Sequence, residues 1–167
     1  EAHALLGGDL VVSAGAEALT KMLEGRTRAV VSCTATPTAD FTRNRDWHFP
    51  RGGMEQSLID TLGRDHVEFL DTQHLATQLM GDALYANMLL LGYAWQKGLV
   101  PVSATALDRA IELNGAAVTA NRQAFAWGRR AAVDPEKVAA IAGPLAGAEL
   151  PESTLDELIA SRTAHLT

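Results

Sequence analysis

The chain has 167 residues, a length that fits one domain and allows folding to bury roughly 70% of the surface exposed by the unfolded chain. Its composition, 47% hydrophobic and 5% aromatic, is typical of a globular, helix-rich protein. The formal net charge of −6 argues against nucleic acid as a partner, because phosphate binding needs a basic surface. The single cysteine, Cys33, excludes an internal disulfide and any cysteine-ligated iron–sulfur cluster within this chain.

The longest apolar run, residues 83–95, contains Asn87 and is shorter than the roughly 20 residues that span a bilayer. The first eight residues show neither the basic region nor the cleavage pattern of a signal peptide. A lone cysteine also suits a reducing compartment. We therefore expect a cytoplasmic protein without a membrane partner.

The first half of the chain alternates short apolar runs with helical segments. The runs cover residues 10–13, 28–33 and 67–70, and the helices between them cover 16–23 and 54–62. Such runs predict buried parallel strands with helices on both faces. The predicted fold class is therefore α/β, a partial Rossmann-like parallel sheet of about three strands flanked by helices, with a helical C-terminal half.

The second half is predicted to be helical throughout. Asp82 and Ser103 are good N-caps, and Asp134 before Pro135 begins a further helix. The second helix of this half is apolar on every side, so we expect it to be buried all round. The predicted helices cover residues 71–80, 83–97, 104–114, 116–130, 135–142 and 154–166.

Both ends of the chain look cut. The first predicted strand begins at residue 10, with no strand before it to open a doubly wound sheet. At the other end an apolar stripe runs to the last residues without a stop signal. We therefore expect the chain to be a piece of a longer protein.

Two kinds of small-molecule site are not predicted. Gly7 and Gly8 precede the predicted first strand, and residues 13–16 lack the G-x-G-x-x-G spacing of a dinucleotide site. Asp71 and His74 have a helical i,i+3 spacing that could point both toward a metal. Asp71 suits a helix cap equally well, and no second pair of ligands accompanies these two.

Two asparagines stand among apolar neighbours in predicted helices, Asn87 and Asn121. A buried amide is costly without hydrogen-bond partners. We therefore predict a structural polar network that holds the helical half together, with a ligand-facing role as the alternative.

A long segment of residues 34–53 separates the second and third predicted strands and shows no helix or strand pattern. It follows a strand, at the edge where α/β sheets place their contacts, and long loops of this kind tend to be functional. It contains both aromatic residues and arginines, and both types are enriched at interface cores. We predict a docking surface for another domain or for a second copy of the chain in a homodimer; a solvated surface loop is the alternative. The candidate docking residues are Pro37, Thr38, Asp40, Phe41, Arg43, Asn44, Trp47 and Phe49.

Three stretches carry a family resemblance. They are residues 37–44 (PTADFTRN), residues 87–101 (NMLLLGYAWQKGLVP), and residues 110–115 (AIELNG) continuing to Asn121, Phe125 and 127–130 (WGRR). Together with their spacing they cover most of residues 9–132. This combination resembles indolepyruvate ferredoxin oxidoreductase in its fused bacterial form, within the gamma-type domain of the pyruvate/2-oxoacid:ferredoxin oxidoreductase superfamily.

The resemblance implies a reaction and a set of cofactors. Such enzymes decarboxylate indolepyruvate or another arylpyruvate on thiamine diphosphate, pass the acyl group to coenzyme A, and reduce ferredoxin through iron–sulfur clusters. In the family these cofactors belong to other domains, so no catalytic, cofactor-binding or metal-binding residue is assigned here, and the chain alone is expected to be inactive. Its partners would be the other domains or subunits of the same oxidoreductase.

The resemblance also implies a domain division. A gamma-type domain would cover residues 1–132 without the family's N-terminal Gly-rich strand–turn–helix, and residues 133–167 would form a helical extension toward a following domain. The alternative is a self-standing protein-interaction module that shares the fold and has no enzymatic activity.

Overall fold

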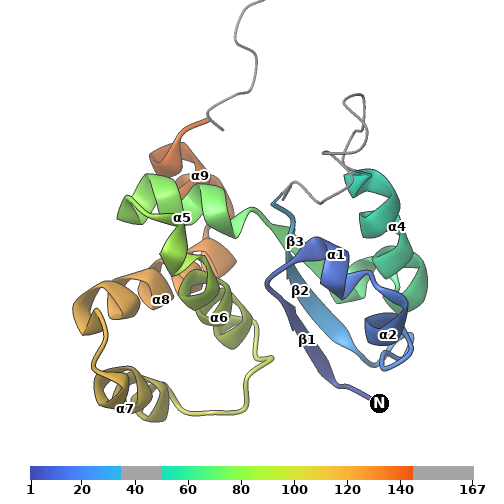
Figure 1. Cartoon of the computed structure of the whole chain (residues 1–167), viewed down its shortest axis with the longest axis horizontal. Helices are drawn as coiled ribbons and strands as arrows, with labels where there is room; N and C mark the ends of the chain where they lie inside the picture. The colour runs from blue at the N-terminus through green and yellow to red at the C-terminus, as the bar shows by residue number, and fades with distance from the viewer. Residues whose placement is uncertain (35–49, 145–167) are drawn as a thin grey trace, which may run out of the picture.

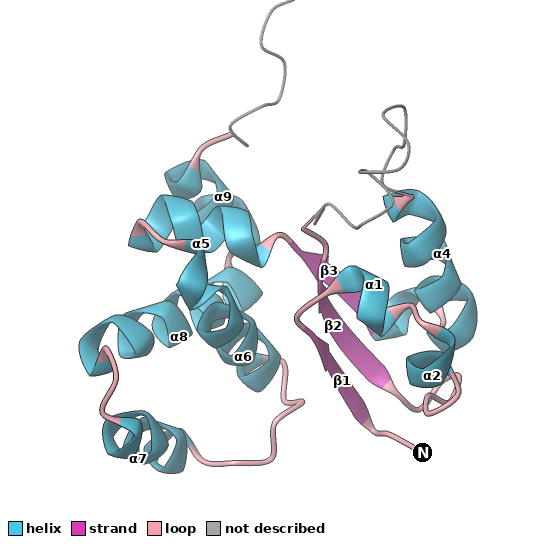
Figure 2. Ribbon diagram, viewed as in Figure 1, coloured by secondary structure: helices cyan, strands magenta, loops and turns pink. Residues whose placement is uncertain are grey.

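The computed structural model describes residues 1–34 and 50–144, which form a parallel sheet with helices on both faces (Figure 1). The sheet has three strands in the order β1 (Ala4–Gly7), β2 (Arg28–Ser32) and β3 (Val67–Leu70). Both neighbouring pairs are parallel. The predicted α/β fold class is confirmed. Helices α1 (Leu10–Ser13), α2 (Ala16–Leu19) and α4 (Arg51–Leu62) lie on one side of the sheet, and the later helices lie on the other (Figure 2).

The central strand β2 joins two hydrophobic cores, because successive side chains of a strand point to opposite faces. Val30 is fully buried in the core that the later helices form. Ala29 and Val31 belong to the other core, with Leu58 and Leu62 of α4. Burial on both faces explains why this strand reads as a continuous apolar run.

Within the described residues, five helices and one short 3₁₀ turn follow β3, and another 3₁₀ turn lies just before it. The predicted caps are confirmed: Asp71, Asp82, Ser103 and Asp134 each accept a hydrogen bond from a backbone N–H of the first turn that follows. The predicted helix over 154–166 lies outside the described residues. None of the helices in the described part of the chain has the length and apolarity needed to cross a bilayer. The elements are η1 (Arg64–His66), α5 (Thr72–Met80), η2 (Ala83–Tyr85), α6 (Ala86–Gln96), α7 (Ala104–Asn114), α8 (Val118–Val133) and α9 (Pro135–Ala142).

The prediction of a first strand at residues 10–13 is wrong, because these residues form helix α1 and the strand lies at residues 4–7. The carboxylate of Asp9 accepts a hydrogen bond from the Val12 N–H at 2.9 Å and so caps the helix. Leu10 is buried in the core beside α4. This cap and this burial outweigh the strand preference of a β-branched run. Gly7 consequently ends the first strand and Gly8 follows it, so neither precedes the strand as predicted.

Helices α6 and α8 cross at two glycines with their backbones in contact. A Cβ atom at Gly92 would lie 2.1 Å from the carbonyl oxygen of Phe125. A Cβ atom at Gly128 would lie 1.9 Å from the carbonyl oxygen of Leu89. Helix α6 is thus enclosed between the sheet and α8, although Asn87 on its first turn is exposed and the predicted burial all round is not complete.

Candidate functional site at the carboxyl edge of the sheet

All three strands end at the same edge because they are parallel. The residues that follow them are Gly8 and Asp9 after β1, Cys33 and Thr34 after β2, and Asp71 after β3. In open α/β sheets this edge is where ligands and contacts are placed. This edge is therefore the candidate functional site.

The predicted docking loop is joined to this edge. Its candidate residues, Pro37 to Phe49, lie outside the described residues, but both flanks of the loop are described. Thr34, on the N-terminal side, donates a hydrogen bond from its hydroxyl to Asp71 Oδ1 at 2.9 Å. Pro50, on the other side, occupies the N-cap position of α4. The loop thus leaves from a residue that is fixed to the carboxyl end of β3.

Four polar side chains form a closed cluster at the ends of β2 and β3. The hydroxyl oxygens of Ser32 and Thr72 are 2.7 Å apart and buried, and Ser32 Oγ lies 3.3 Å from Thr34 Oγ1. Asp71 Oδ1 also accepts the His74 backbone N–H at 3.0 Å, as a helix cap does. These groups satisfy one another, so the cluster braces the strand ends and the start of the loop.

One histidine and one cysteine lie at this edge, and neither side chain is arranged for catalysis. His74 Nε2 lies 3.1 Å from the carbonyl oxygen of Gly143 and links α5 to the end of α9. The pKa of the Cys33 thiol is raised by its burial, which disfavours the nucleophilic thiolate. Among residues 1–34 and 50–144, no three His, Cys, Asp or Glu side chains are grouped so that they could hold a metal ion.

The two asparagines predicted to form one network are apart in the structure. Asn87 is exposed, and a Cβ atom added to Gly8 would lie 3.2 Å from its Oδ1 atom. Asn121 is half-buried and donates from Nδ2 to the carbonyl of Ala116 at 2.9 Å, just before its own helix. The structure therefore does not bring the two amides together, and the expected burial of Asn87 is wrong.

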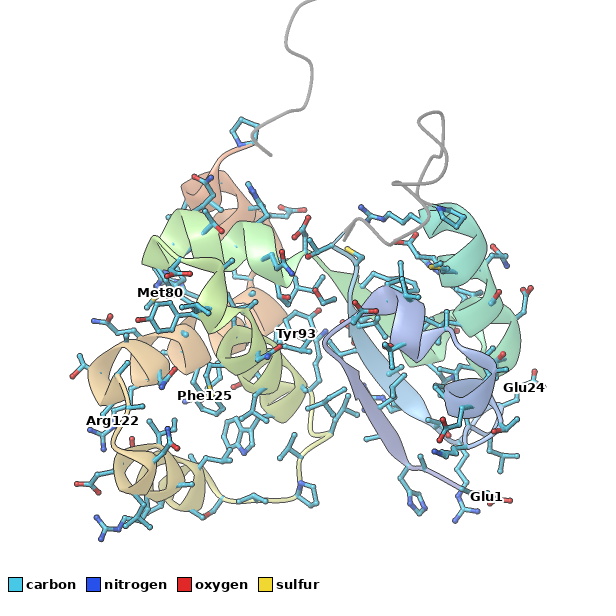
Figure 3. All side chains as sticks on the ribbon, in the orientation of Figure 1. Glu1, Glu24, Met80, Tyr93, Arg122 and Phe125 are labelled. Atoms are coloured by element: carbon cyan, nitrogen blue, oxygen red, sulfur yellow. The ribbon has the colours of Figure 1, made fainter. Side chains whose placement is uncertain are left out.

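A polar cluster that the sequence did not suggest ties α6 to β3. The hydroxyl of Tyr93, which is labelled in Figure 3, donates to Glu68 Oε2 at 2.6 Å. Lys97 Nζ lies 2.8 Å from the same oxygen. Burial alone would raise the pKa of Glu68, but the hydrogen bonds from Lys97 and Tyr93 outweigh it and lower that pKa. Burial, together with the hydrogen bond to this carboxylate, raises the pKa of Tyr93.

The one sequence signal for this cluster was the i,i+4 spacing of Tyr93 and Lys97 on a predicted helix. Glu68 lies in the middle of an apolar run, and its partners come from an element far along the chain. The cluster keeps Glu68 ionised and Tyr93 neutral, so Tyr93 can donate its hydrogen bond to the carboxylate and join α6 to β3.

Comparison with protein-family models, with curated proteins and with solved structures finds no match to this chain.

Proposed function

We propose that this chain is a non-catalytic, gamma-type domain of a 2-oxoacid:ferredoxin oxidoreductase that acts on indolepyruvate or another arylpyruvate. The whole enzyme would oxidatively decarboxylate the 2-oxoacid to an acyl-CoA and reduce ferredoxin. Thiamine diphosphate and the iron–sulfur clusters would be held by its other domains. The domain described here would pack against them and position them.

The observation that carries the proposal is the contact between two of the resembling stretches. Residues 87–101 include most of α6, and residues 110–130 include the end of α7 and most of α8. Gly92, in the first of these stretches, and Gly128, in the second, are the positions where the two backbones touch. A side chain at either position would collide with main-chain atoms, so the packing itself requires these residues. Motif residues with such a packing role favour a shared scaffold over a chance similarity.

The chemistry of the carboxyl edge supports a non-catalytic role. A nucleophile needs a neighbouring base or a depressed pKa. The Ser32 and Thr72 hydroxyls bond to each other instead, and Asp71 is occupied by Thr34 and by its own helix. The Cys33 thiol has a raised pKa. The described groups at this edge are thus engaged in holding the fold.

The proposed docking surface is the loop that leaves this edge at Thr34. Amide hydrogen exchange tests it: amides from Ala39 to Trp47 should exchange fast in the chain alone and be protected in the complete enzyme. Equal protection in both would mean that the loop packs on its own domain, and the docking proposal would be abandoned.

The proposed identity is tested by the complete gene and by cofactor binding. The gene that encodes this chain should also encode a thiamine diphosphate site and cysteine-rich cluster motifs. The chain alone should bind neither cofactor, as measured by calorimetry with thiamine diphosphate and by cluster absorbance after anaerobic purification. A complete gene without those motifs would contradict the proposal and favour the self-standing interaction module.

A further inference from the structure

We infer that the outer face of helix α8 docks an acidic surface of another domain or subunit of the oxidoreductase. This docking face is separate from the loop that leaves the carboxyl edge of the sheet. The inference rests on the proposed function, since that function supplies the partner. Helix α6 lies between α8 and the sheet, so the outer face of α8 is turned away from the sheet (Figure 1).

One face of α8 is exposed over most of the length of the helix. Residues three and four positions apart lie on the same face of a helix. The residues that face the core are Ala124, Phe125, Gly128 and Ala131. The exposed residues that form the outer face are Arg122, Gln123, Ala126, Arg129, Arg130 and Val133.

The outer face carries positive charge that the described part of the chain does not neutralise. Helix α8 contains three arginines and no acidic residue, in a chain whose net charge is −6. Arg122 is paired with Asp108 of α7 through two hydrogen bonds. Among residues 1–34 and 50–144, no carboxylate lies within ion-pair distance of Arg129 or Arg130. These two charges are available to a partner.

Both of these guanidinium groups lie over tryptophan rings. The Arg129 guanidinium is 4.7 Å from the centre of the Trp95 ring, and its Nε donates to Gln96 at 3.0 Å. The Arg130 guanidinium is 5.8 Å from the centre of the Trp127 ring. A guanidinium held on a ring can take a carboxylate through two parallel N–H groups with little further loss of freedom. Arginine and tryptophan are also the residue types that dominate the binding energy of protein interfaces.

The hollows on this face have the size of side chains. Two hollows of about 230 Å³ each meet at Ala126. One is lined by Gln123, Trp127 and Arg130, and the other extends to Arg129. Sites for small molecules and cofactors usually measure about 300–1,000 Å³. The face therefore fits a protein surface that offers carboxylates together with an apolar side chain.

Charge also selects among the possible macromolecular partners. In a two-fold dimer through this face, each arginine would meet the arginines of the second copy, and like charges repel. Nucleic acid would meet a chain of net charge −6, with Asp108 lining the second hollow. An acidic protein surface meets neither obstacle.

Labelling of arginines with phenylglyoxal, measured by peptide mass spectrometry, tests the inference. Arg129 and Arg130 should react at least about tenfold more slowly in the complete enzyme than in the chain alone, because a docked interface excludes solvent. Arg109 is the control, since it is exposed on α7 and lies outside the docking face. It should react alike in both samples.

Equal labelling of Arg130 in the two samples overturns the inference, whether or not the enzyme reduces ferredoxin. Protection in a complete protein that holds no iron–sulfur cluster would contradict the proposed function and overturn the assignment of the partner to an oxidoreductase. Protection that develops only when ferredoxin is added would identify ferredoxin as the occupant and overturn the assignment to the enzyme's own domains.

A substitution tests the acidic chemistry of the partner. Arg130→Gln removes the charge from an exposed position, so it should lower the melting temperature of the complete enzyme more than that of the chain alone. The excess should shrink at a salt concentration on the order of 1 M, because salt screens exposed charges. Arg109→Gln, the matched control, should affect both samples equally. An equal effect of Arg130→Gln on both samples, or an excess that salt does not reduce, would contradict an acidic partner.

Discussion

Replacing Gly128 with alanine would put a methyl group into the contact between α6 and α8. The new Cβ atom would lie 1.9 Å from the Leu89 carbonyl oxygen and 2.9 Å from the Tyr93 nitrogen. Ordinary van der Waals contact begins at 3.4 Å, so the two helices would have to separate by about 1.5 Å at this point. Both clashing atoms belong to the backbone and cannot rotate away.

The cost can be estimated from two opposing effects. Overpacking a core costs about 1–3 kcal/mol, and the upper part of that range applies because the clash is with main chain. Alanine in a helix gains about 1 kcal/mol over glycine. We expect a net loss of about 2 kcal/mol of unfolding free energy, or a melting temperature lower by about 4–8 °C for a chain of this size.

Urea unfolding followed by circular dichroism measures this loss, and Gly52→Ala is the matched control. Gly52 also lies in a helix, but it is exposed and a Cβ atom there would meet nothing within 4 Å. This control should gain about 0.5–1 kcal/mol. If Gly128→Ala were as stable as the unaltered chain, or gained as much as the control, the close crossing of α6 and α8 would be refuted.

Three further predictions concern polar groups. Asn87→Leu should change the unfolding free energy by less than about 0.5 kcal/mol, because the amide is exposed; a loss above 1 kcal/mol would restore the buried network. Ser32→Ala should cost about 1–3 kcal/mol by leaving the buried Thr72 hydroxyl unpaired, and a melting temperature equal to that of the parent would show that the pair does not form. Glu68 has a lowered pKa, so its stabilisation is complete above the unfolded value of about 4.3 and is lost as pH falls through the folded value. Glu68→Gln should therefore lower the melting temperature at neutral pH, and the difference should shrink below about pH 4; a difference that persists in acid would show that the ion pair with Lys97 is not its source.

Local signals were enough to predict much of the fold. The runs at 28–33 and 67–70 became β2 and β3, and every cap predicted from Asp or Ser within the described residues holds a helix start. An N-cap is a hydrogen bond between residues no more than three positions apart, and a buried strand is recognised by its run of apolar residues. Both are visible in one sequence.

The first strand was not visible for a related reason. Ala4–Gly7 contains no β-branched residue, whereas residues 10–13 contain Val11 and Val12. Propensity therefore favoured the wrong segment, and only the Asp9 cap and the burial of Leu10 decide between them.

The surroundings of α6 could not be predicted, because they consist of contacts between elements that are distant in the sequence. The close approach of Gly92 to Phe125, the bond from Tyr93 to Glu68 and the exposure of Asn87 all depend on how α6 sits between its neighbours. The apolar composition of a helix predicts that it will be buried, but it does not predict which of its few polar side chains will be exposed.

The central claim is that this chain belongs to an arylpyruvate-oxidising enzyme whose chemistry lies in other domains. The most direct test is ferredoxin reduction by the complete protein, purified without oxygen and supplied with indolepyruvate and coenzyme A. We predict reduction that requires both substrates and thiamine diphosphate, and none from the chain alone. A complete protein that holds no iron–sulfur cluster and reduces no ferredoxin with any arylpyruvate would contradict the claim.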